Sequence, residues 1–384
     1  MLRVAVGAAK RGVEVHAAFP STEATASMIR SCALGGVHYH PFDLGAPARP
    51  FRGGSSPARF LQLARLLDVV RPDVVQLTVG WPGEAPRLVV PCAVKEVPAL
   101  VVFQFAPEPW GLSAVQIWAC RWARTRRQRW AAVSQQNLRS LQQTFRARRG
   151  EFDVLYNGIE VAPDRPAAAD AETGALRDAV RRELDLPFAS RLLLTVARLD
   201  PVKGHADLLR AARELVEQHP DVRFVWVGDG PERAHLESVI GQLGLERHVR
   251  VLGYRSDIDR LLRAADLLVH PSHGEGGCSS SIREAMVYRL PIVASRAGGI
   301  PEVLRDGKDA LLFDAGDLEQ LQWCLSQALT VPALMRKLAD DARHRIMEFS
   351  AERMVDHYMV AFEALWRNPG ADPREPHPAS VRGV

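Results

Sequence analysis

The second half of the chain alternates short apolar runs with helical patterns, and this alternation restricts the fold more than any other feature of the sequence. From residue 191 onward the apolar runs occupy residues 192–196, 223–227, 249–252, 267–270, 292–295 and 310–313. Each run is rich in Leu or β-branched residues, and helical periodicity follows most of them. Six strands with intervening helices predict a parallel, doubly wound α/β sheet.

The first half repeats this scheme less regularly. Its apolar runs occupy residues 13–19, 37–39, 74–78, 100–103, 131–133 and 154–155. A chain of 384 residues exceeds what one hydrophobic core usually supports, and residues 161–173, rich in Ala, Pro and Asp, are typical of an interdomain linker. We therefore predict two Rossmann-like parallel-sheet domains that face a ligand-binding cleft.

These patterns divide the chain into four regions. Residues 1–165 are expected to form the first domain and residues 166–350 the second, while residues 351–367 form a C-terminal helix. Residues 368–384 carry four Pro and several charges with little to bury, which predicts a disordered tail.

Composition excludes several classes of protein. No apolar stretch reaches the roughly 18 residues of a membrane span, and the first residues have the wrong charge order for a secretory signal, so a cytoplasmic protein is expected. The five cysteines include no C-x-x-C pair, which favours buried thiols over a zinc site or a disulfide framework.

Basic residues cluster in the first half, although the net charge is only +4. The main run contains Arg121, Arg124, Arg126, Arg127 and Arg129. A solvated helix face is the more common outcome of such a run, and contact with an anionic membrane surface or an acidic substrate is the alternative. Nucleic-acid binding ranks lower, because Trp122 and Trp130 are the only interleaved aromatic platforms.

A candidate diphosphate site follows the predicted strand 192–196. Arg198 and Lys203 lie in the stretch RLDPVKG, which opens a helix. The carboxyl end of a parallel strand, two cations and the unpaired amides of a helix start together favour a phosphate ligand. Exposed basic residues that only increase solubility are the alternative.

Two glycine-rich strand ends add weaker signals. Gly228 and Gly230 follow strand 223–227, and Gly253 with Tyr254 follows strand 249–252. Glycine at these places allows a sharp turn or a close approach of the backbone to a ligand. Main-chain groups near Gly253 are therefore candidates for contacting a nucleobase edge.

The most specific cluster begins at the end of strand 267–270. It reads HPSHGEGGCSSSIREAM over residues 270–286, then PIVAS over 291–295 and GGIPE over 298–302. In this order the motifs resemble glycosyltransferase family 4, the retaining GT-B enzymes. The resemblance covers residues 192–313 closely, and the sequence NGI at residues 157–159 is similar to the domain-exchange signature of that family.

The resemblance implies a role for each matching residue. Arg198 and Lys203 would bind the donor diphosphate, Glu284 the ribose hydroxyls and Glu275 the hydroxyls of the donor sugar. The amides of Gly276, Gly277, Cys278 and Ser279 would surround sugar and phosphate at a helix start. No metal or other cofactor is then expected, because cations and helix dipole neutralise the leaving diphosphate.

One departure concerns the spacing of the two glutamates. The family places seven residues between them, whereas eight separate Glu275 from Glu284. With Glu284 in its helix, Gly276 occupies the position of the family's first Glu, and Glu275 reaches the sugar only if one glycine is looped out. Another departure is Ala310, where the family often has Gly.

The first half departs from the family at two further places. About twenty residues of the usual first strand, Gly-rich loop and helix have no counterpart by motif counting, which predicts an incomplete sheet. The strand VVFQF at residues 101–105 lacks the His that family members often carry after it. Gln104, Glu108 and Trp110 are the candidates for lining an acceptor pocket, and packing as core or loop is their alternative role.

The sequence therefore predicts a retaining glycosyltransferase that moves a sugar from a nucleoside diphosphate sugar to a hydroxyl acceptor. The acceptor would be a glycan, a lipid-linked sugar or a small molecule. A lipid acceptor would add Trp110, Trp118 and Trp122 to the basic run as peripheral contacts with an anionic membrane. The alternative hypothesis is an inactive nucleotide-sugar-binding protein, with an incomplete first domain and a shifted glutamate pair.

Overall fold

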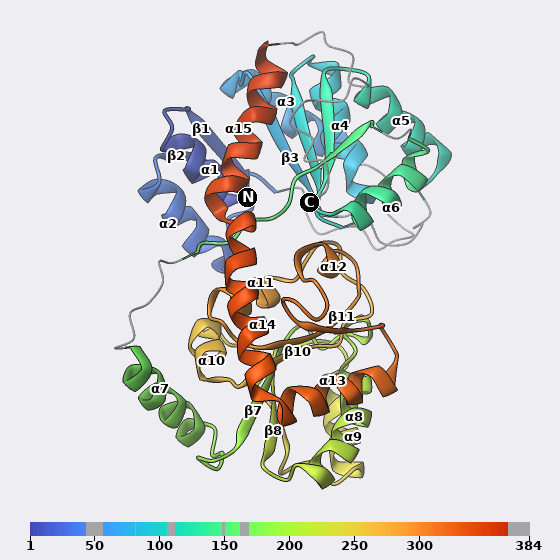
Figure 1. The fold of residues 1–384 in the computed structure, drawn as a ribbon. Coiled ribbons are helices and arrows are strands. Elements are labelled where there is room, and N and C mark those ends of the chain that lie inside the picture. Colours follow the sequence, from blue (N-terminus) through green and yellow to red (C-terminus); the bar gives the residue numbers. More distant parts are fainter. Residues whose placement is uncertain (44–56, 81, 106–111, 148–149, 162–168, 368–384) are drawn as a thin grey trace. The chain divides into compact units, whose positions relative to one another are not determined.

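The computed structural model describes the chain except residues 44–56, 81, 106–111, 148–149, 162–168 and 368–384 (Figure 1). The chain forms two compact units. Unit 1 combines Met1–Glu160 with the segment that starts at Phe349, and unit 2 is Val161–Glu348. The division at Glu160 lies shortly before the expected boundary at residue 165, and residue 349 already belongs to unit 1.

Unit 2 contains one six-stranded parallel sheet in the order β12-β11-β10-β7-β8-β9. Its strands are β7 (Arg191–Val196), β8 (Val222–Val227), β9 (Val249–Val251), β10 (Leu267–His270), β11 (Ile292–Ser295) and β12 (Leu311–Phe313). The predicted runs coincide with these strands to within a residue at each end. Because β7 lies beside both β8 and β10, the direction of the strand order reverses there, as in a doubly wound fold.

Helices cover both faces of this sheet. They are α7 (Ala169–Glu183), α8 (His205–Gln218), α9 (Arg233–Gln242), α10 (Ile258–Ala264), α11 (Ser280–Val287), α12 (Ile300–Val303), α13 (Leu318–Thr330) and α14 (Pro332–Arg345), with 3-10 turns η3 (Pro201–Lys203) and η4 (Ile346–Phe349). The core joins Leu208 of α8 and Leu325 of α13 to Phe224 and Trp226 of the sheet. Since α7 begins at Ala169, residues 169–173 are helical and the predicted linker was too long at that end.

Unit 1 contains two separate parallel sheets. One joins β1 (Val15–Phe19) to β2 (Val37–Pro41), and the other has the order β3-β4-β5-β6. The second is formed by β3 (Val75–Val79), β4 (Ala99–Phe103), β5 (Gln128–Ala132) and β6 (Phe152–Val154). With the six-stranded sheet of unit 2, these sheets confirm the predicted α/β class with two parallel-sheet domains.

The helices of unit 1 come from both ends of the chain. They are α1 (Leu2–Ala9), α2 (Ala26–Leu34), α3 (Pro57–Val70), α4 (Ala85–Val94), α5 (Ala114–Arg124), α6 (Gln135–Phe145) and α15 (Ala351–Arg367), with 3-10 turns η1 (Glu23–Thr25) and η2 (Pro82–Glu84). Helix α1 ends at Ala9, with Lys10 as its C-cap residue. In Figure 1, α15 runs beside α1, and both contribute to a core with β4 and β5 through Val4, Leu100 and Tyr358.

A close backbone crossing attaches α15 to the end of the β6 segment. The amide of Ile159 donates to the carbonyl of Phe349 at 3.0 Å, and the amide of Ala351 donates to the carbonyl of Ile159 at 2.7 Å. Gly158 permits this approach, since a Cβ there would lie 2.6 Å from the carbonyl oxygen of Ser350. The NGI sequence thus lies where the chain from unit 2 re-enters unit 1.

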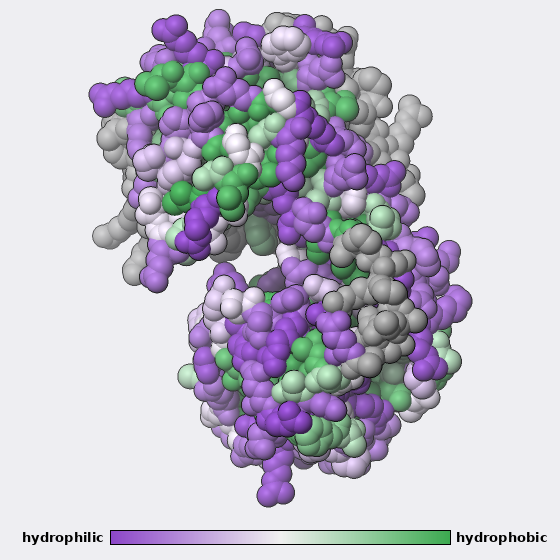
Figure 2. Space-filling model, turned by 90° about the vertical axis from the view of Figure 1, so that its left-hand side faces the viewer, coloured by the Kyte–Doolittle hydropathy of each residue, from purple (hydrophilic) through white to green (hydrophobic). Residues whose placement is uncertain are grey.

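Figure 2 shows one face of the molecule, coloured by hydropathy. On the face that Figure 2 shows, apolar residues form patches among hydrophilic ones. In the described part of the chain, none of the helices combines the length and the apolar character that a membrane crossing requires.

Candidate functional site

The loops after β7 and β10 meet at the point where the strand order of unit 2 reverses. Strands β7 and β10 are neighbours, so their carboxyl ends present both loops to the same region. The amide of His273 donates to the carbonyl of Val202 at 2.7 Å, and the hydroxyl of Ser272 donates to the same carbonyl at 3.1 Å. This junction brings the predicted phosphate loop against the predicted sugar loop.

Lys203, His270 and Glu275 form a buried charged cluster at this junction. The ammonium of Lys203 lies 2.5 Å from Oε1 of Glu275, and Nε2 of His270 lies 2.9 Å from the same oxygen. The side chains of His270 and Glu275 are 1% and 7% exposed, and that of Lys203 is 16% exposed. A carboxylate is therefore held inside unit 2 by two donors on one oxygen.

The surroundings of Glu275 keep it ionised. Burial by itself raises the pKa of this carboxyl, but the hydrogen bond and electrostatic attraction of His270, together with those of Lys203, lower the pKa to about 2. At neutral pH Glu275 therefore acts only as a hydrogen-bond acceptor. An ionised carboxylate is suited to accept hydrogen bonds from the hydroxyl groups of a sugar.

Glycines allow the backbone around Glu275 to pack tightly. Gly298 follows β11 with φ +52°, and a Cβ at this residue would lie 1.9 Å from the carbonyl oxygen of Glu275. Gly204, with φ +71°, makes a similar approach, and a Cβ there would lie 2.0 Å from the carbonyl oxygen of Pro271. Two of the sequence motifs, KG and GG, thus supply the space in which the loop after β10 lies.

The loop between the two glutamates bends at its glycines. Gly276 and Gly277 form the bend, and α11 starts at Ser280 with Ser279 as its N-cap residue. Glu284 lies in α11, as predicted, and is partly buried. The extra residue is therefore accommodated in the loop, before the helix begins, and it is Glu275 that lies with Lys203.

Cys278 precedes the N-cap residue of α11. Burial raises the pKa of its thiol to about 12, so it is a neutral thiol at physiological pH. Cys92 and Cys120, in unit 1, also have pKa values raised by burial to about 12. Cys92 and Cys120 are therefore buried thiols, as the sequence predicted, whereas Cys278 is only partly buried.

Arg198, the other predicted phosphate ligand, lies outside the buried cluster. Its side chain is 72% exposed and lies 3.1 Å from Asp200. Asp200 is the N-cap of η3, and its carboxylate accepts from the amide of Val202. Arg198 is thus an exposed cation near the same loop, paired with a neighbour in sequence.

The two glycine-rich strand ends lie together in the structure. As separate motifs in the sequence, they gave no indication of this contact. The amide of Gly228 donates to the carbonyl of Gly253 at 2.9 Å. A Cβ on Gly228 would lie 1.9 Å from the carbonyl oxygen of Ala197, and one on Gly230 would lie 2.2 Å from that of Leu199. These glycines therefore pack against the β7 loop.

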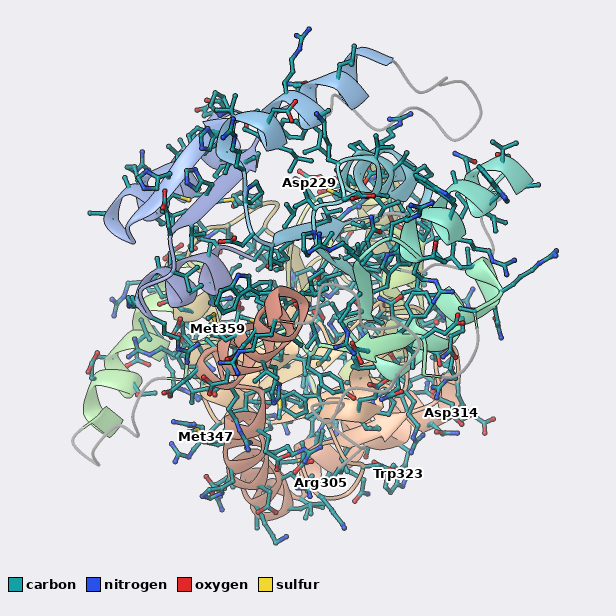
Figure 3. All side chains as sticks on the ribbon, turned by 90° about the horizontal axis from the view of Figure 1, so that it is seen from above. Asp229, Arg305, Asp314, Trp323, Met347 and Met359 are labelled. Carbon is teal, nitrogen blue, oxygen red and sulfur yellow. The ribbon has the colours of Figure 1, made fainter. Side chains whose placement is uncertain are left out.

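Side chains near these glycines are open to solvent. Tyr254 is 83% exposed. Asp229, between Gly228 and Gly230 and labelled in Figure 3, accepts a 3.2 Å contact from Arg233. A planar, exposed Tyr254 beside the Gly253 turn is available to stack on a ring.

Sequence reasoning missed the structural role of two histidines, one of which is His270. His270 is the last residue of β10, as the predicted strand 267–270 indicated, but the sequence did not indicate that its side chain is buried. His205, the first residue of α8, is also buried, and its ring meets Trp226 edge-on with centroids 5.0 Å apart. Burial, assisted by His270 and Lys203, lowers the pKa of His205 to about 4. The position of His270 at a strand's carboxyl end was the one signal in the sequence.

The candidate acceptor residues of unit 1 are only partly described. Gln104 lies just beyond β4 and accepts a 3.1 Å hydrogen bond from the side-chain amide of Asn157. This bond links the strand end to the NGI segment. Glu108 and Trp110 lie outside the described residues.

The basic run of unit 1 is divided among different environments. Arg124 pairs with Glu151 at 3.0 Å, both largely buried, and Arg129 of β5 lies 3.6 Å from Asp153. The guanidinium of Arg126 lies 5.3 Å from the ring centroid of Trp122. The run therefore does not form the single solvated helix face that the sequence favoured, because it crosses from α5 into β5.

Helix α5 carries one exposed group of side chains. Val115 and Trp118 are 74% and 66% exposed, and Arg121, one turn further, is exposed as well. Residues 115, 118 and 121 follow at helical spacing, so they lie near one another on one side of α5.

Two family models match the chain, one in each half. A model described as "Glycosyltransferase Family 4" matches residues 1–162, and one described as "Glycosyl transferases group 1" matches residues 177–345. The D-inositol 3-phosphate glycosyltransferase of Corynebacterium urealyticum is 28% identical over 248 residues, covering 62% of this chain and 57% of that protein. The putative glycosyltransferase EpsD of Bacillus subtilis is 31% identical over 173 residues, 45% of each chain. The chain thus spans about half the length of these relatives.

Solved structures resemble the whole chain. HepE of Anabaena, in complex with UDP and glucose, superposes with a TM-score of 0.77 at 19% identity and 94% coverage of both chains. WaaG, a glycosyltransferase involved in lipopolysaccharide biosynthesis, superposes with a TM-score of 0.66 at 18% identity, covering 95% of this chain and 94% of its own. At these identities the similarity concerns the fold, which is that of GT-B glycosyltransferases.

Proposed function

Because the chain belongs to the family 4 glycosyltransferases of GT-B fold, we propose that it transfers a sugar from a nucleoside diphosphate sugar to a hydroxyl acceptor. The observation that carries this proposal is the junction of the β7 and β10 loops. There Lys203, Glu275 and the start of α11 lie at the reversal of a doubly wound sheet, the usual ligand position of such folds.

We propose UDP as the nucleotide of the donor. Solved structures of HepE contain UDP and UDP-glucose, and HepE shares the fold of this chain. In this proposal the backbone at Gly228, Gly230 and Gly253 and the exposed ring of Tyr254 contact the base, while Glu284 of α11 accepts hydrogen bonds from the ribose hydroxyls. These two assignments, to the base and to the ribose, are supported by the position of the named groups around the β7 loop and α11.

Lys203 and Arg198 are proposed to bind the diphosphate. The ammonium of Lys203 has three donors, and Glu275 engages it through one oxygen, so further donors remain for a phosphate. Arg198 is exposed and reaches the same loop, and the amides of Gly276, Gly277, Cys278 and Ser279 precede α11. These groups would neutralise the leaving diphosphate without a metal ion.

The reaction is proposed to retain the anomeric configuration. The departing phosphate oxygen would take the acceptor proton on the face from which it leaves, while Lys203 and Arg198 stabilise the negative charge that develops on the diphosphate. Glu275 would hold the donor sugar through its hydroxyls. No protein nucleophile takes part in this scheme.

The acceptor is proposed to be a hydroxyl of a lipid-linked sugar, with Gln104 lining its site. The exposed Val115, Trp118 and Arg121 of α5 favour this acceptor, because an aromatic, an apolar and a cationic side chain on one helix face suit an anionic lipid surface. Sedimentation with anionic vesicles tests this: the W118S and R121E variants should bind less. Trp323 of α13, 59% exposed and labelled in Figure 3, supplies the matched control W323S.

Calorimetric titration of UDP, GDP and ADP tests the donor site. The full-length protein should bind UDP, and Arg198→Ala and Lys203→Met should each weaken this binding about tenfold or more, since each removes a charged hydrogen bond to phosphate. Lys337→Ala, at an exposed lysine of α14, is the matched control. Absence of nucleotide binding in a folded protein would refute the proposed function.

Turnover separates the proposal from its alternative. Incubation of the protein with UDP-sugars and acceptor mixtures should release UDP, with and without EDTA. Nucleotide-sugar binding without any release of UDP would favour the alternative hypothesis, a binding protein without catalytic activity. Loss of UDP release in EDTA would refute the metal-free scheme alone.

A further inference from the structure

His270 has no route to a substrate, yet it contacts a residue that the proposed function places against the donor sugar. Its side chain is 1% exposed at the end of β10, a strand that lies between β7 and β11 in the sheet. Its nitrogen Nε2 reaches Oε1 of Glu275 at 2.9 Å. Any effect of His270 on a sugar must therefore act through Glu275.

One hydrogen bond defines Nε2 of His270 as a donor. Glu275 is ionised and can only accept, so Nε2 carries the proton of this bond. The other ring nitrogen, Nδ1, is buried and has no hydrogen-bond partner among the described residues.

Both donors act on the same oxygen of Glu275. Lys203 and His270 approach Oε1 from different elements, the β7 loop and the end of β10. Within the described part of the chain, Oε2 receives no hydrogen bond. The backbone of Glu275 is also confined, since its carbonyl oxygen lies where a Cβ of residue 298 would stand.

We propose that His270 is a positioning residue, which holds the Glu275 carboxylate with Oε2 directed away from its two donors and open to a hydroxyl of the donor sugar. This inference rests on the proposed function. Lys203 alone would leave the carboxylate free to rotate, because an ammonium on a flexible chain follows either oxygen. The rigid imidazole on a central strand removes that freedom.

Two substitutions at this position separate a positioning role from a packing role. The side-chain amide of His270→Gln places an N–H near the position of Nε2, whereas that of His270→Asn reaches only the position of Nδ1. Calorimetry would use UDP, UDP-glucose and UDP-N-acetylglucosamine on the full-length protein. For the UDP-sugar that binds the unmodified protein most tightly, His270→Asn should weaken binding about tenfold, and His270→Gln should restore it to within about threefold.

Binding of UDP alone should be unchanged in both variants, because Glu275 faces the sugar and not the nucleotide. His235→Asn, at an exposed histidine of α9, is the matched control. If His270 were only a packing residue, affinity for UDP and for the UDP-sugar would fall together, and His270→Gln would not rescue either. That result, or unchanged UDP-sugar binding in His270→Asn, would overturn the inference.

A double-mutant cycle with Glu275→Gln gives a second test if His270→Asn folds poorly. Glu275→Gln should weaken UDP-sugar binding, and His270→Gln and His270→Asn should then differ little from each other in that background. A further tenfold loss there would show an effect that bypasses Glu275 and would overturn the inference. Binding of UDP but of no UDP-sugar by the unmodified protein would overturn it too, whereas binding of neither would refute the proposed function itself.

Discussion

The positions of individual residues in the candidate site depend on the space that neighbouring glycines leave as much as on charged partners. The carboxylate of Glu275 is buried with two donors, and its backbone lies against Gly298. Gly298 has a positive φ, and a Cβ at this residue would clash with the carbonyl oxygen of Glu275. The backbone of Glu275 can therefore occupy its position only because residue 298 has no side chain. The glycine after β11 thus leaves the space that the backbone of Glu275, after β10, occupies.

Gly298→Ala is therefore expected to destabilise unit 2 and to displace Glu275. The clash with backbone and the strain at φ +52° should cost at least about 2 kcal/mol in the free energy of unfolding. Thermal unfolding and UDP-sugar calorimetry measure the two effects. Gly174→Ala is the matched control, because nothing lies within 4 Å of its Cβ and alanine in helix α7 should stabilise by about 0.5 to 1 kcal/mol. Equal stabilities of the two variants would contradict this account.

His205 makes the stability of unit 2 dependent on pH. Its pKa is lowered from 6.5 to about 4 by burial, so the folded state disfavours protonation that the unfolded state accepts. This contribution to stability is complete above pH 6.5 and is lost as the pH falls to about 4, by roughly 3 kcal/mol in total.

The unfolding temperature of unit 2 should therefore fall more steeply between pH 7 and pH 4.5 in the natural protein than in His205→Leu. Differential scanning calorimetry over this pH range makes the comparison. His235→Leu, at an exposed position, should follow the natural protein. Parallel curves for all three proteins would show that His205 is not the buried neutral group described above.

At the scale of elements, the crossing between the β6 segment and α15 depends on a close approach of two backbones. The hydrogen bonds of Ile159 with Phe349 and Ala351 connect the end of the β6 segment to the start of α15. These two segments lie almost 200 residues apart in the sequence. Gly158 lies against Ser350 and Met354 at this point. The first turn of α15 is thereby attached to the sheet of unit 1.

Gly158→Ala should separate these segments. Its Cβ would lie 2.6 Å from the carbonyl oxygen of Ser350 and 3.0 Å from Cα of Ala351, both backbone atoms that cannot move aside cheaply. Hydrogen exchange at the amides of Ile159 and Ala351 should become at least about tenfold faster, a change of roughly 1.4 kcal/mol in opening free energy. Gly83→Ala, in the 3-10 turn η2, should leave both amides protected, because a Cβ there would meet only a side-chain methyl of Leu112 at 4.0 Å. Unchanged exchange in Gly158→Ala would disprove the close crossing.

At the scale of the molecule, the two ends of the chain stabilise the same unit. Tyr358 and Met354 of α15 are buried with Val4 of α1 and with Leu100 and Val102 of β4. Unit 2 lies between these ends in sequence and has its own core. The stability of unit 1 should therefore depend on residues that follow unit 2 in the chain.

Tyr358→Ala tests this dependence. Removal of a fully buried ring should destabilise unit 1 by about 3 to 5 kcal/mol and leave the unfolding of unit 2 unchanged. Scanning calorimetry combined with hydrogen exchange assigns each transition to its unit. Val360→Ala, on an exposed part of the same helix, is the control. A shift of the unit 2 transition with unit 1 intact would contradict the division described here.

The amino-acid sequence alone determined the fold class and the candidate loops. Strand periodicity, helical spacing and the positions of Gly are local properties, so the runs around β7, β8, β10 and β11 were located to within a residue, and the family resemblance followed from motifs in a fixed order. The roles assigned to Arg198, Lys203, Glu275 and Glu284 remain predictions that binding experiments must test.

Only the tertiary structure decided which of these residues lie together. Lys203 and Glu275 are 72 residues apart in the chain and meet because β7 and β10 are neighbours in the sheet. His270 is buried because its strand is central, a property that no local pattern of polar residues encodes. The same applies to the basic run, where Arg124 is buried with Glu151. Pairings between distant segments depend on the packing of the whole unit, and a local sequence pattern does not contain them.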